Sequence, residues 1–124
     1  MTVHLSVVDV ERTDLVVVVL EGELDHATSG TFRAEVEERC DPSAEQLVLD
    51  PRRVALVDSA GLGALLRLGH RAAEGGRRLG LISAEGAMLR RLLRITRLEE
   101  AFAVGDDLDG VREALAAPAP EQQG

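Results

Sequence analysis

The 124-residue sequence is poor in residues that many binding and catalytic sites require. It has two phenylalanines, Phe32 and Phe102, no tryptophan or tyrosine, and 14 basic residues that are all arginine. Without tryptophan or tyrosine, the chain lacks the base-stacking platforms of proteins that bind single-stranded nucleic acids. The net charge of −8 also opposes the phosphate neutralisation that drives nucleic acid binding. We therefore expect no nucleic acid partner, no lysine chemistry such as a Schiff base, and an aliphatic core.

Cysteine and long apolar runs are equally scarce. Cys40 is the only cysteine, so no disulfide can form within the chain, and this usage is typical of a reducing cytosol. The longest apolar run, residues 15–20, is far too short to span a bilayer. The N-terminus lacks the basic and apolar regions of a signal peptide. These features predict a soluble, cytoplasmic protein with no membrane partner.

The length suits one hydrophobic core and is too short for two. Apolar runs and alternation predict strands, at residues 3–7, 15–20, 47–49, 54–57, 79–82 and 101–104. Apolar residues spaced by three and four predict helices, over residues 28–40, 60–74, 83–95 and 107–116. This alternation indicates an α/β fold, in which helices pack on a mixed, mostly parallel sheet. We expect a single domain over residues 1–116 and a disordered tail over 117–124.

Local details are also predicted. Pro51 should end the strand at 47–49, because proline cannot donate a hydrogen bond to a sheet. Ser83 should cap the third helix. The inward face of that helix would hold its apolar side chains, Met88, Leu89, Leu92, Leu93 and Ile95. The second helix would bury the apolar positions Leu62, Leu65, Leu66, Gly69 and Ala73. Four arginines would share another side of the third helix, Arg90, Arg91, Arg94 and Arg97. That side is either a solvated face or a contact for an acidic partner.

The most informative segment runs from Asp58 to Gly63 and reads Asp-Ser-Ala-Gly-Leu-Gly. It places one hydroxyl, that of Ser59, between a strand and the helix at 60–74. A helix start offers free backbone N–H groups and a partial positive charge, which accommodate a phosphate. The alternative is that Ser59 is an ordinary N-cap, a position that serine favours.

A second segment, Gly22-Glu23-Leu24-Asp25-His26-Ala27-Thr28, follows the apolar run at 15–20. Together, in this order and spacing, the two segments resemble the anti-sigma factor antagonists, small bacterial proteins built on the STAS domain. The resemblance covers about residues 3–115 and implies the STAS fold, with Ser59 as the phosphate acceptor. Where the family commonly has a second hydroxyl, this sequence has Ala60.

The resemblance implies a switch. The unphosphorylated protein would bind an anti-sigma factor and free the sigma factor. The anti-sigma factor, an ATP-dependent serine kinase, would phosphorylate Ser59 and end the association, and a serine phosphatase would reset it. The partner-binding residues would be Asp25, His26, Asp58, Ser59, Ala60, Gly61, Leu62, Gly63 and Arg67. The rival hypothesis keeps the fold but makes the chain an unphosphorylated STAS module of a larger sensory or transport assembly.

Catalytic and metal sites are not indicated. A triad of Ser59, His26 and Asp25 can be drawn, but the sequence has no Gly-x-Ser-x-Gly elbow, and adjacent residues seldom supply an orienting pair. No cluster of cysteine, histidine and carboxylates has metal-ligand spacing. The pair Gly61 and Gly63 lacks the third glycine of a dinucleotide loop. We expect a protein that is not an enzyme, with no catalytic residue, no metal and no cofactor.

Overall fold

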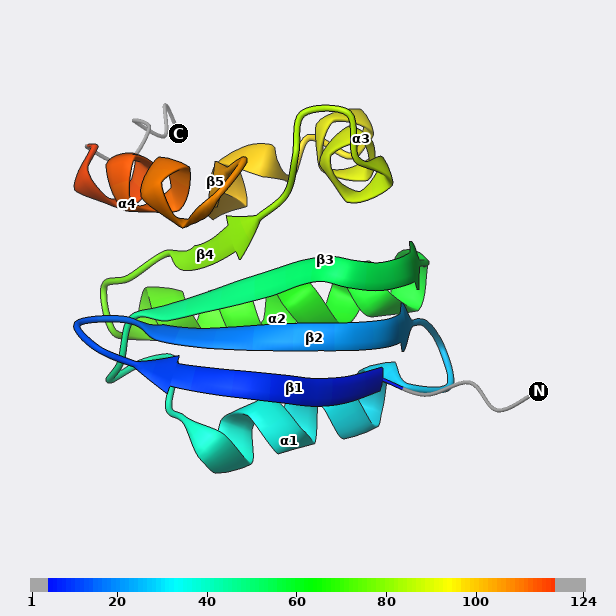
Figure 1. Ribbon diagram of the computed structural model, residues 1–124, viewed down its shortest axis with the longest axis horizontal. Coiled ribbons are helices and arrows are strands. Elements are labelled where there is room, and N and C mark those ends of the chain that lie inside the picture. The colour runs from blue at the N-terminus through cyan, green and yellow to red at the C-terminus, as the bar shows by residue number, and fades with distance from the viewer. Residues whose placement is uncertain (1–4, 118–124) are drawn as a thin grey trace.

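The computed structural model describes residues 5–117, and for residues 5–12 the backbone alone. One five-stranded sheet with the order β1-β2-β3-β4-β5 forms its centre (Figure 1). The strands are β1 (Leu5–Arg12), β2 (Val16–Leu24), β3 (Leu47–Val57), β4 (Leu79–Ile82) and β5 (Phe102–Gly105). The helices are α1 (Ser29–Arg39), α2 (Ser59–Glu74), α3 (Met88–Ile95), α4 (Leu108–Ala116) and the short 3-10 helix η1 (Glu99–Ala101).

The sheet is mixed and mostly parallel, which confirms the predicted α/β fold. β1 runs antiparallel to β2, and every neighbouring pair from β2 to β5 is parallel. The register of β2 and β3 pairs Leu24 with Val57, the last residue of each strand. The loops that follow these two strands therefore begin side by side at one edge of the sheet.

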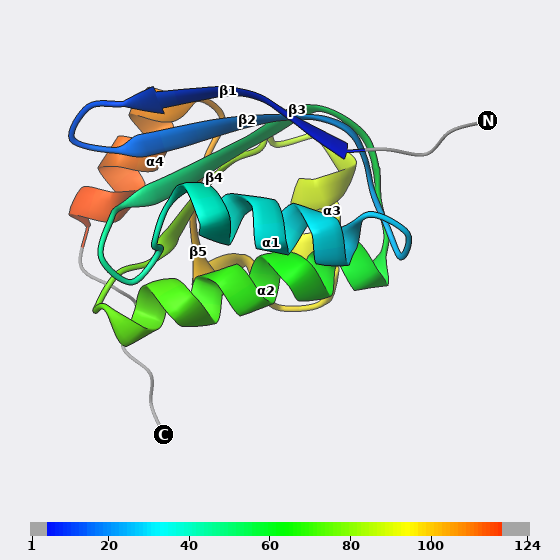
Figure 2. The same cartoon turned by 90° about the horizontal axis from the view of Figure 1, so that it is seen from below.

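Helices cover both faces of the sheet. α1 and α2 lie next to each other beneath it (Figure 2), and α3 joins them in one apolar cluster. Alternate residues of β2 enter this cluster, Val16, Val18 and Leu20. Leu15, directly before β2, and Val17, between Val16 and Val18, pack in a second cluster with Val111 of α4. Because successive side chains of a strand point to opposite faces, the continuous apolar run of β2 serves both cores.

β3 differs from the prediction, because it is one strand and not two. Pro51 lies inside it, at an irregularity between the register pairs Val19–Asp50 and Glu21–Arg53. There, one residue of β2 lies opposite two residues of β3, as in a β-bulge. β4 pairs only with Val48 and Leu49, so the rest of β3 is an edge on that side. A proline is tolerated at an edge or a bulge, and the prediction that Pro51 ends the strand is wrong.

α3 also differs from the prediction. It begins at Met88 with Ala87 in the N-cap position, so Ser83 does not cap it. Leu89 and Leu93 are buried, but Met88 and Ile95 are 60% and 74% exposed. The helix has eight residues and presents only a narrow stripe to the core, which two leucines four positions apart fill.

The buried face of α2 confirms the prediction in part. It comprises Gly61, Leu62, Ala64, Leu65, Leu68 and Ala72. Leu66 is partly buried and packs against the same cluster, and Gly69 is half-buried, so Ala73 is the one predicted position that is exposed. At the termini, residues 3 and 4 of the first predicted strand and residues 118–124 of the predicted tail lie outside the described part of the chain.

Candidate functional site

The loops that follow β2 and β3 are joined by one side chain, Asp58. Its Oδ1 accepts a hydrogen bond from the Gly61 N–H at 2.9 Å, and its Oδ2 accepts one from the His26 N–H at 3.1 Å. The Asp58 N–H donates to the Leu24 carbonyl at 3.2 Å. Asp58 therefore caps α2 and also holds the start of that helix against the loop after β2.

Ser59 is the first residue of α2, and its side chain is exposed. Because Asp58 supplies the side-chain cap, the alternative in which Ser59 is the N-cap is wrong. Among the described residues, no hydrogen bond involves the Ser59 hydroxyl. This hydroxyl is thus open to solvent at a helix N-terminus, where free N–H groups favour an anion.

The Asp25 carboxylate is engaged inside its own loop. Its Oδ1 accepts from the N–H groups of Ala27 at 2.9 Å and Thr28 at 3.1 Å. The buried Thr28 hydroxyl accepts from the Asp25 N–H at 3.0 Å and donates to the Glu23 carbonyl at 2.7 Å. These bonds make Asp25 a turn-forming residue and leave His26 and Ala27 as the exposed residues of the loop.

The site carries negative charge. The backbone N–H groups of Gly61 first, and then of His26 and Ala60, hold the pKa of Asp58 below its usual value, because they stabilise the carboxylate form. Asp58 is therefore ionised at neutral pH, directly before the Ser59 hydroxyl. Asp25 lies in the adjoining loop. A phosphate on Ser59 would add charge of the same sign.

Gly61 lets α2 approach the end of β2. A Cβ atom at this position would lie 2.3 Å from the carbonyl oxygen of Leu24 and 2.8 Å from its Cγ. Only glycine fits without a shift of the backbone, so Gly61 is required for the contact that brings Ser59 beside the Asp25 loop. The neighbouring Leu62 is buried in the core.

The predicted site residues thus fall into two groups. Gly61 and Leu62 are buried and pack α2 against the rest of the fold beneath the exposed residues of the site. The surface comprises exposed His26 and Ser59, partly exposed Asp25, Asp58, Ala60 and Gly63, and exposed Arg67 farther along α2. Past the site, Arg67 and His70 line a shallow polar groove with Arg33 of α1.

The triad that was rejected from the sequence has no geometric support either. Among the described residues, no hydrogen bond connects the side chains of Asp25, His26 and Ser59. Within the same residues, no group of three His, Cys, Asp or Glu side chains is placed to hold a metal ion. The helices of the described part are all too short or too polar to cross a membrane.

Two arginines of α3, Arg90 and Arg94, form ion pairs with acidic side chains of the same chain. Arg90 donates to Glu99 at 2.8 Å and to the carbonyl of the buried Ser83 at 2.8 Å. Its guanidinium also lies 3.6 Å from both Glu85 and Asp106. Arg94 forms ion pairs with Glu85 and Glu99. The sequence pattern gives no sign of this network, because its acids come from three separate segments of the chain. Arg90 and Arg94 therefore join these segments within the fold.

Comparison with known proteins identifies the architecture. A family model described as "Mlab, STAS domain" matches residues 8–110. The chain belongs to the STAS domain family. The resemblance noted in the sequence is thereby confirmed at the level of the domain, and the β2 and β3 loops of this STAS domain carry the two segments that indicated it.

Solved structures with the same fold include anti-sigma factor antagonists. One from Mycobacterium paratuberculosis has 23% identity and a TM-score of 0.75, with 91% of this chain and 95% of that chain covered. The unphosphorylated form of SpoIIAA has 20% identity and a TM-score of 0.60, with 85% and 93% covered. The phosphorylated Bacillus SpoIIAA has 19% identity and a TM-score of 0.58, with 85% and 96% covered. At these identities the likeness concerns the fold.

Proposed function

We propose that this STAS domain is an anti-sigma factor antagonist whose binding to a kinase-type anti-sigma factor ends when Ser59 is phosphorylated. The observation that carries the proposal is the exposed Ser59 hydroxyl at the start of α2, which forms no hydrogen bond within the described part of the chain and is held beside the Asp25 loop by Asp58. A fold shared with antagonists, one of them solved both with and without phosphate, supports it.

The chemistry requires the chain to act only as a substrate. The kinase transfers the γ-phosphoryl group of ATP to the Ser59 Oγ, the hydroxyl proton passes to a base of the kinase, and ADP leaves. A serine phosphatase later hydrolyses the ester and restores the hydroxyl. No group of this chain other than Ser59 gains or loses a bond, so no cofactor of its own is needed.

The magnitude of the switch follows from charge. A phosphate adds about −1.5 to −2 charges. One like-charge pair about 5 Å apart near a surface costs about 3 kcal/mol at an effective dielectric constant of about 20, which is on the order of a hundredfold in affinity. The interaction of the phosphate with the helix N-terminus stabilises it by only about 0.3–1 kcal/mol. The free protein therefore tolerates a phosphate on the exposed Ser59. In an interface, repulsion by a like charge of the partner would weaken binding.

The proposal is tested by incubating the protein with its kinase-type anti-sigma factor and ATP, followed by peptide mapping. We expect phosphate on Ser59 alone, since Ala60 removes the neighbouring hydroxyl and the Thr28 hydroxyl is buried and bonded. Labelling of Ser59→Ala would contradict this. A native partner from a sensory or transport assembly, retained equally with and without ATP, would favour the rival hypothesis of an unphosphorylated module.

A further inference from the structure

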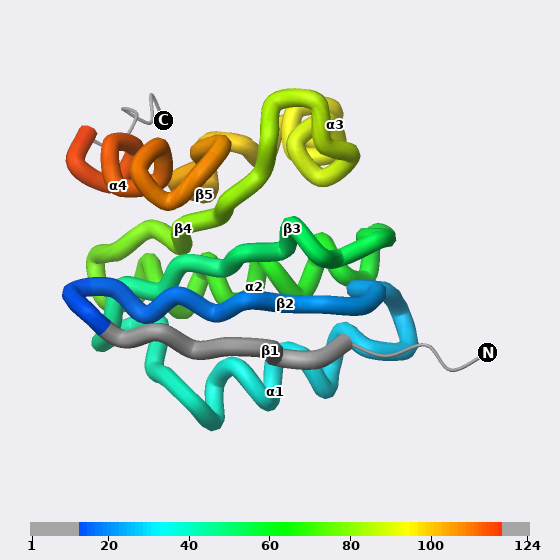
Figure 3. Tube along the Cα trace, in the orientation of Figure 1, coloured from blue at the N-terminus to red at the C-terminus, as the bar shows by residue number. Residues whose placement is uncertain are grey.

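A groove opens where β3 loses its neighbour. β4 pairs with β3 only at Val48 and Leu49 and ends at Ile82. The chain then turns away through residues 83–87 into α3, as the Cα trace shows (Figure 3). β3 continues to Val57, so its second half has no strand on this side. The start of α3 forms the opposite wall.

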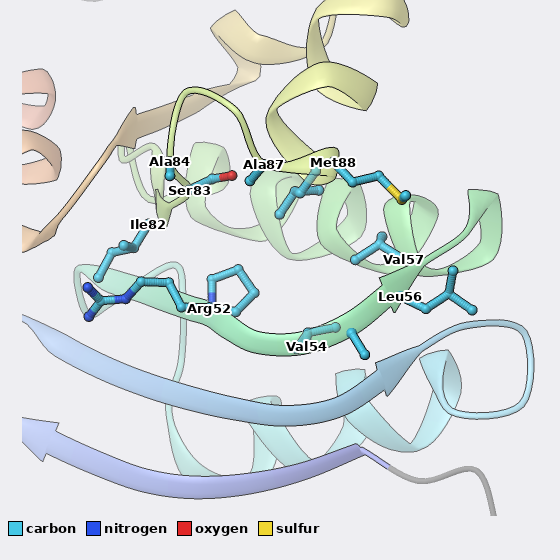
Figure 4. Close-up of a pocket in the computed structure, with 12 residues that line it drawn as sticks. Arg52, Val54, Leu56, Val57, Ile82, Ser83, Ala84, Ala87 and Met88 are labelled. Atoms are coloured by element: carbon cyan, nitrogen blue, oxygen red, sulfur yellow. The ribbon is translucent and has the colours of Figure 1, made fainter.

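The lining of this groove is mainly apolar (Figure 4). Val54, Leu56 and Val57 come from β3, and Ala87 and Met88 come from the start of α3. Its volume is about 210 Å³, which is below the roughly 300–1,000 Å³ of pockets for drug-sized ligands. A cavity of about 150 Å³ already accommodates benzene. The groove therefore suits one large apolar side chain better than a cofactor.

Exposed apolar side chains gather at this groove. Among the described residues, the exposed large hydrophobic side chains are Leu56, Met88 and Ile95. Leu56 and Met88 line the groove from opposite walls, and Met88 reaches toward Val57 (Figure 4). Ile95 lies at the far end of α3 and does not line it. Clustered exposed apolar groups are typical of interaction sites.

The groove adjoins the segment that carries Ser59. Val57 lines it, and Ser59 follows two residues later. A specific interface covers about 800 Å² and roughly 20–30 residues on each partner, far more than the few exposed side chains of the two loops. A protein bound at Ser59 must therefore extend over neighbouring surface. A few anchor side chains buried in pockets, most often aromatic residues or arginine, supply most binding energy, whereas exposed ion pairs add at most about 1 kcal/mol.

We propose that this groove binds one large apolar side chain of the anti-sigma factor and anchors that partner beside Ser59. The proposal rests on the function proposed above and names the contact that supplies its affinity. A second copy of this chain is a poorer occupant, because a net charge of −8 opposes self-association. Anchoring next to Ser59 excludes water there, which strengthens the repulsion that a phosphate introduces.

The test uses matched truncations on one helix. Met88→Ser removes an exposed apolar side chain that lines the groove, and Ile95→Ser removes one that does not. Leu56→Ser tests the opposite wall. Each variant of the full chain is titrated calorimetrically with the anti-sigma factor at fixed salt, after circular dichroism has confirmed its fold. We expect Met88→Ser and Leu56→Ser to weaken binding at least fivefold and Ile95→Ser less than twofold.

The outcomes separate the two proposals. Binding by wild type that all three variants retain would overturn the groove and leave the switch standing. If Ile95→Ser lost as much affinity for the anti-sigma factor as Met88→Ser, the groove proposal would also be overturned, because a residue outside the groove would matter equally. If wild type does not bind any kinase-type anti-sigma factor, the proposed function itself fails. Sedimentation that shows a wild-type dimer, which Met88→Ser dissociates without changing anti-sigma affinity, would assign the groove to a second copy instead.

Discussion

Replacement of Gly61 by alanine tests whether close packing positions the site. The added Cβ would lie 2.3 Å from the Leu24 carbonyl oxygen, and this oxygen belongs to backbone that cannot rotate away. Overpacking of this kind costs about 1–3 kcal/mol. Against it, alanine is favoured over glycine inside a helix by about 1 kcal/mol. Displacement of the helix also strains the two hydrogen bonds of Asp58. We expect a net loss of about 1–2 kcal/mol in the free energy of unfolding.

Gly63→Ala is the matched control. It lies two residues further along α2, and nothing is within 4 Å of a Cβ added there. Without a clash, the same exchange should stabilise the protein by about 0.4–1 kcal/mol. Urea unfolding followed by circular dichroism measures both variants. If Gly61→Ala were as stable as Gly63→Ala, α2 would not be held against the end of β2 as described, and the reasoning about the site would be refuted.

Two further predictions concern local stability. Arg97 has a φ of 60°, the left-handed region in which a non-glycine residue costs roughly 1–2 kcal/mol. Arg97→Gly should therefore raise the unfolding free energy by up to about 1 kcal/mol in urea titrations, and a decrease would show that the arginine side chain matters more than the strain. Asp58 has a folded-state pKa below its usual value, mainly because of the Gly61 N–H. Its contribution to stability is thus full above the unfolded pKa of about 3.9 and is lost as the pH falls through the lower folded pKa. Asp58→Asn, which keeps a good N-cap, should lose less stability than wild type between pH 6 and pH 2, and identical acid profiles would contradict the assignment.

The order of elements could be predicted because each carries its own periodicity. The continuous apolar run of β2 and the apolar spacing of α1 and α2 are local signals, and two parallel strands must bring their following loops to one edge. The approach of the Asp25 loop to Ser59 therefore followed from the sequence pattern. Asp58 was located as well, but its bond to the His26 N–H spans 32 residues and has no local signature.

The errors arise where distant parts of the chain decide the outcome. Pro51 was expected to end a strand, but it is tolerated because β4 is too short to reach it. Spacing alone assigns Met88 and Ile95 to the core, but only Leu89 and Leu93 of α3 are buried in the structure. The partners of Arg90 come from residues 85, 99 and 106, so their convergence could not be deduced from helix periodicity.

The central claim is most directly tested by the affinity of the anti-sigma factor for wild type, Ser59→Ala, Ser59→Asp and the Ser59-phosphorylated protein. Because Asp58 and not Ser59 caps α2, all four should fold alike by circular dichroism. We predict that Ser59→Ala binds as wild type does, that Ser59→Asp binds more weakly, and that phosphorylation weakens binding on the order of a hundredfold, as the charge argument requires. Equal affinities of the phosphorylated and unphosphorylated proteins would contradict the switch.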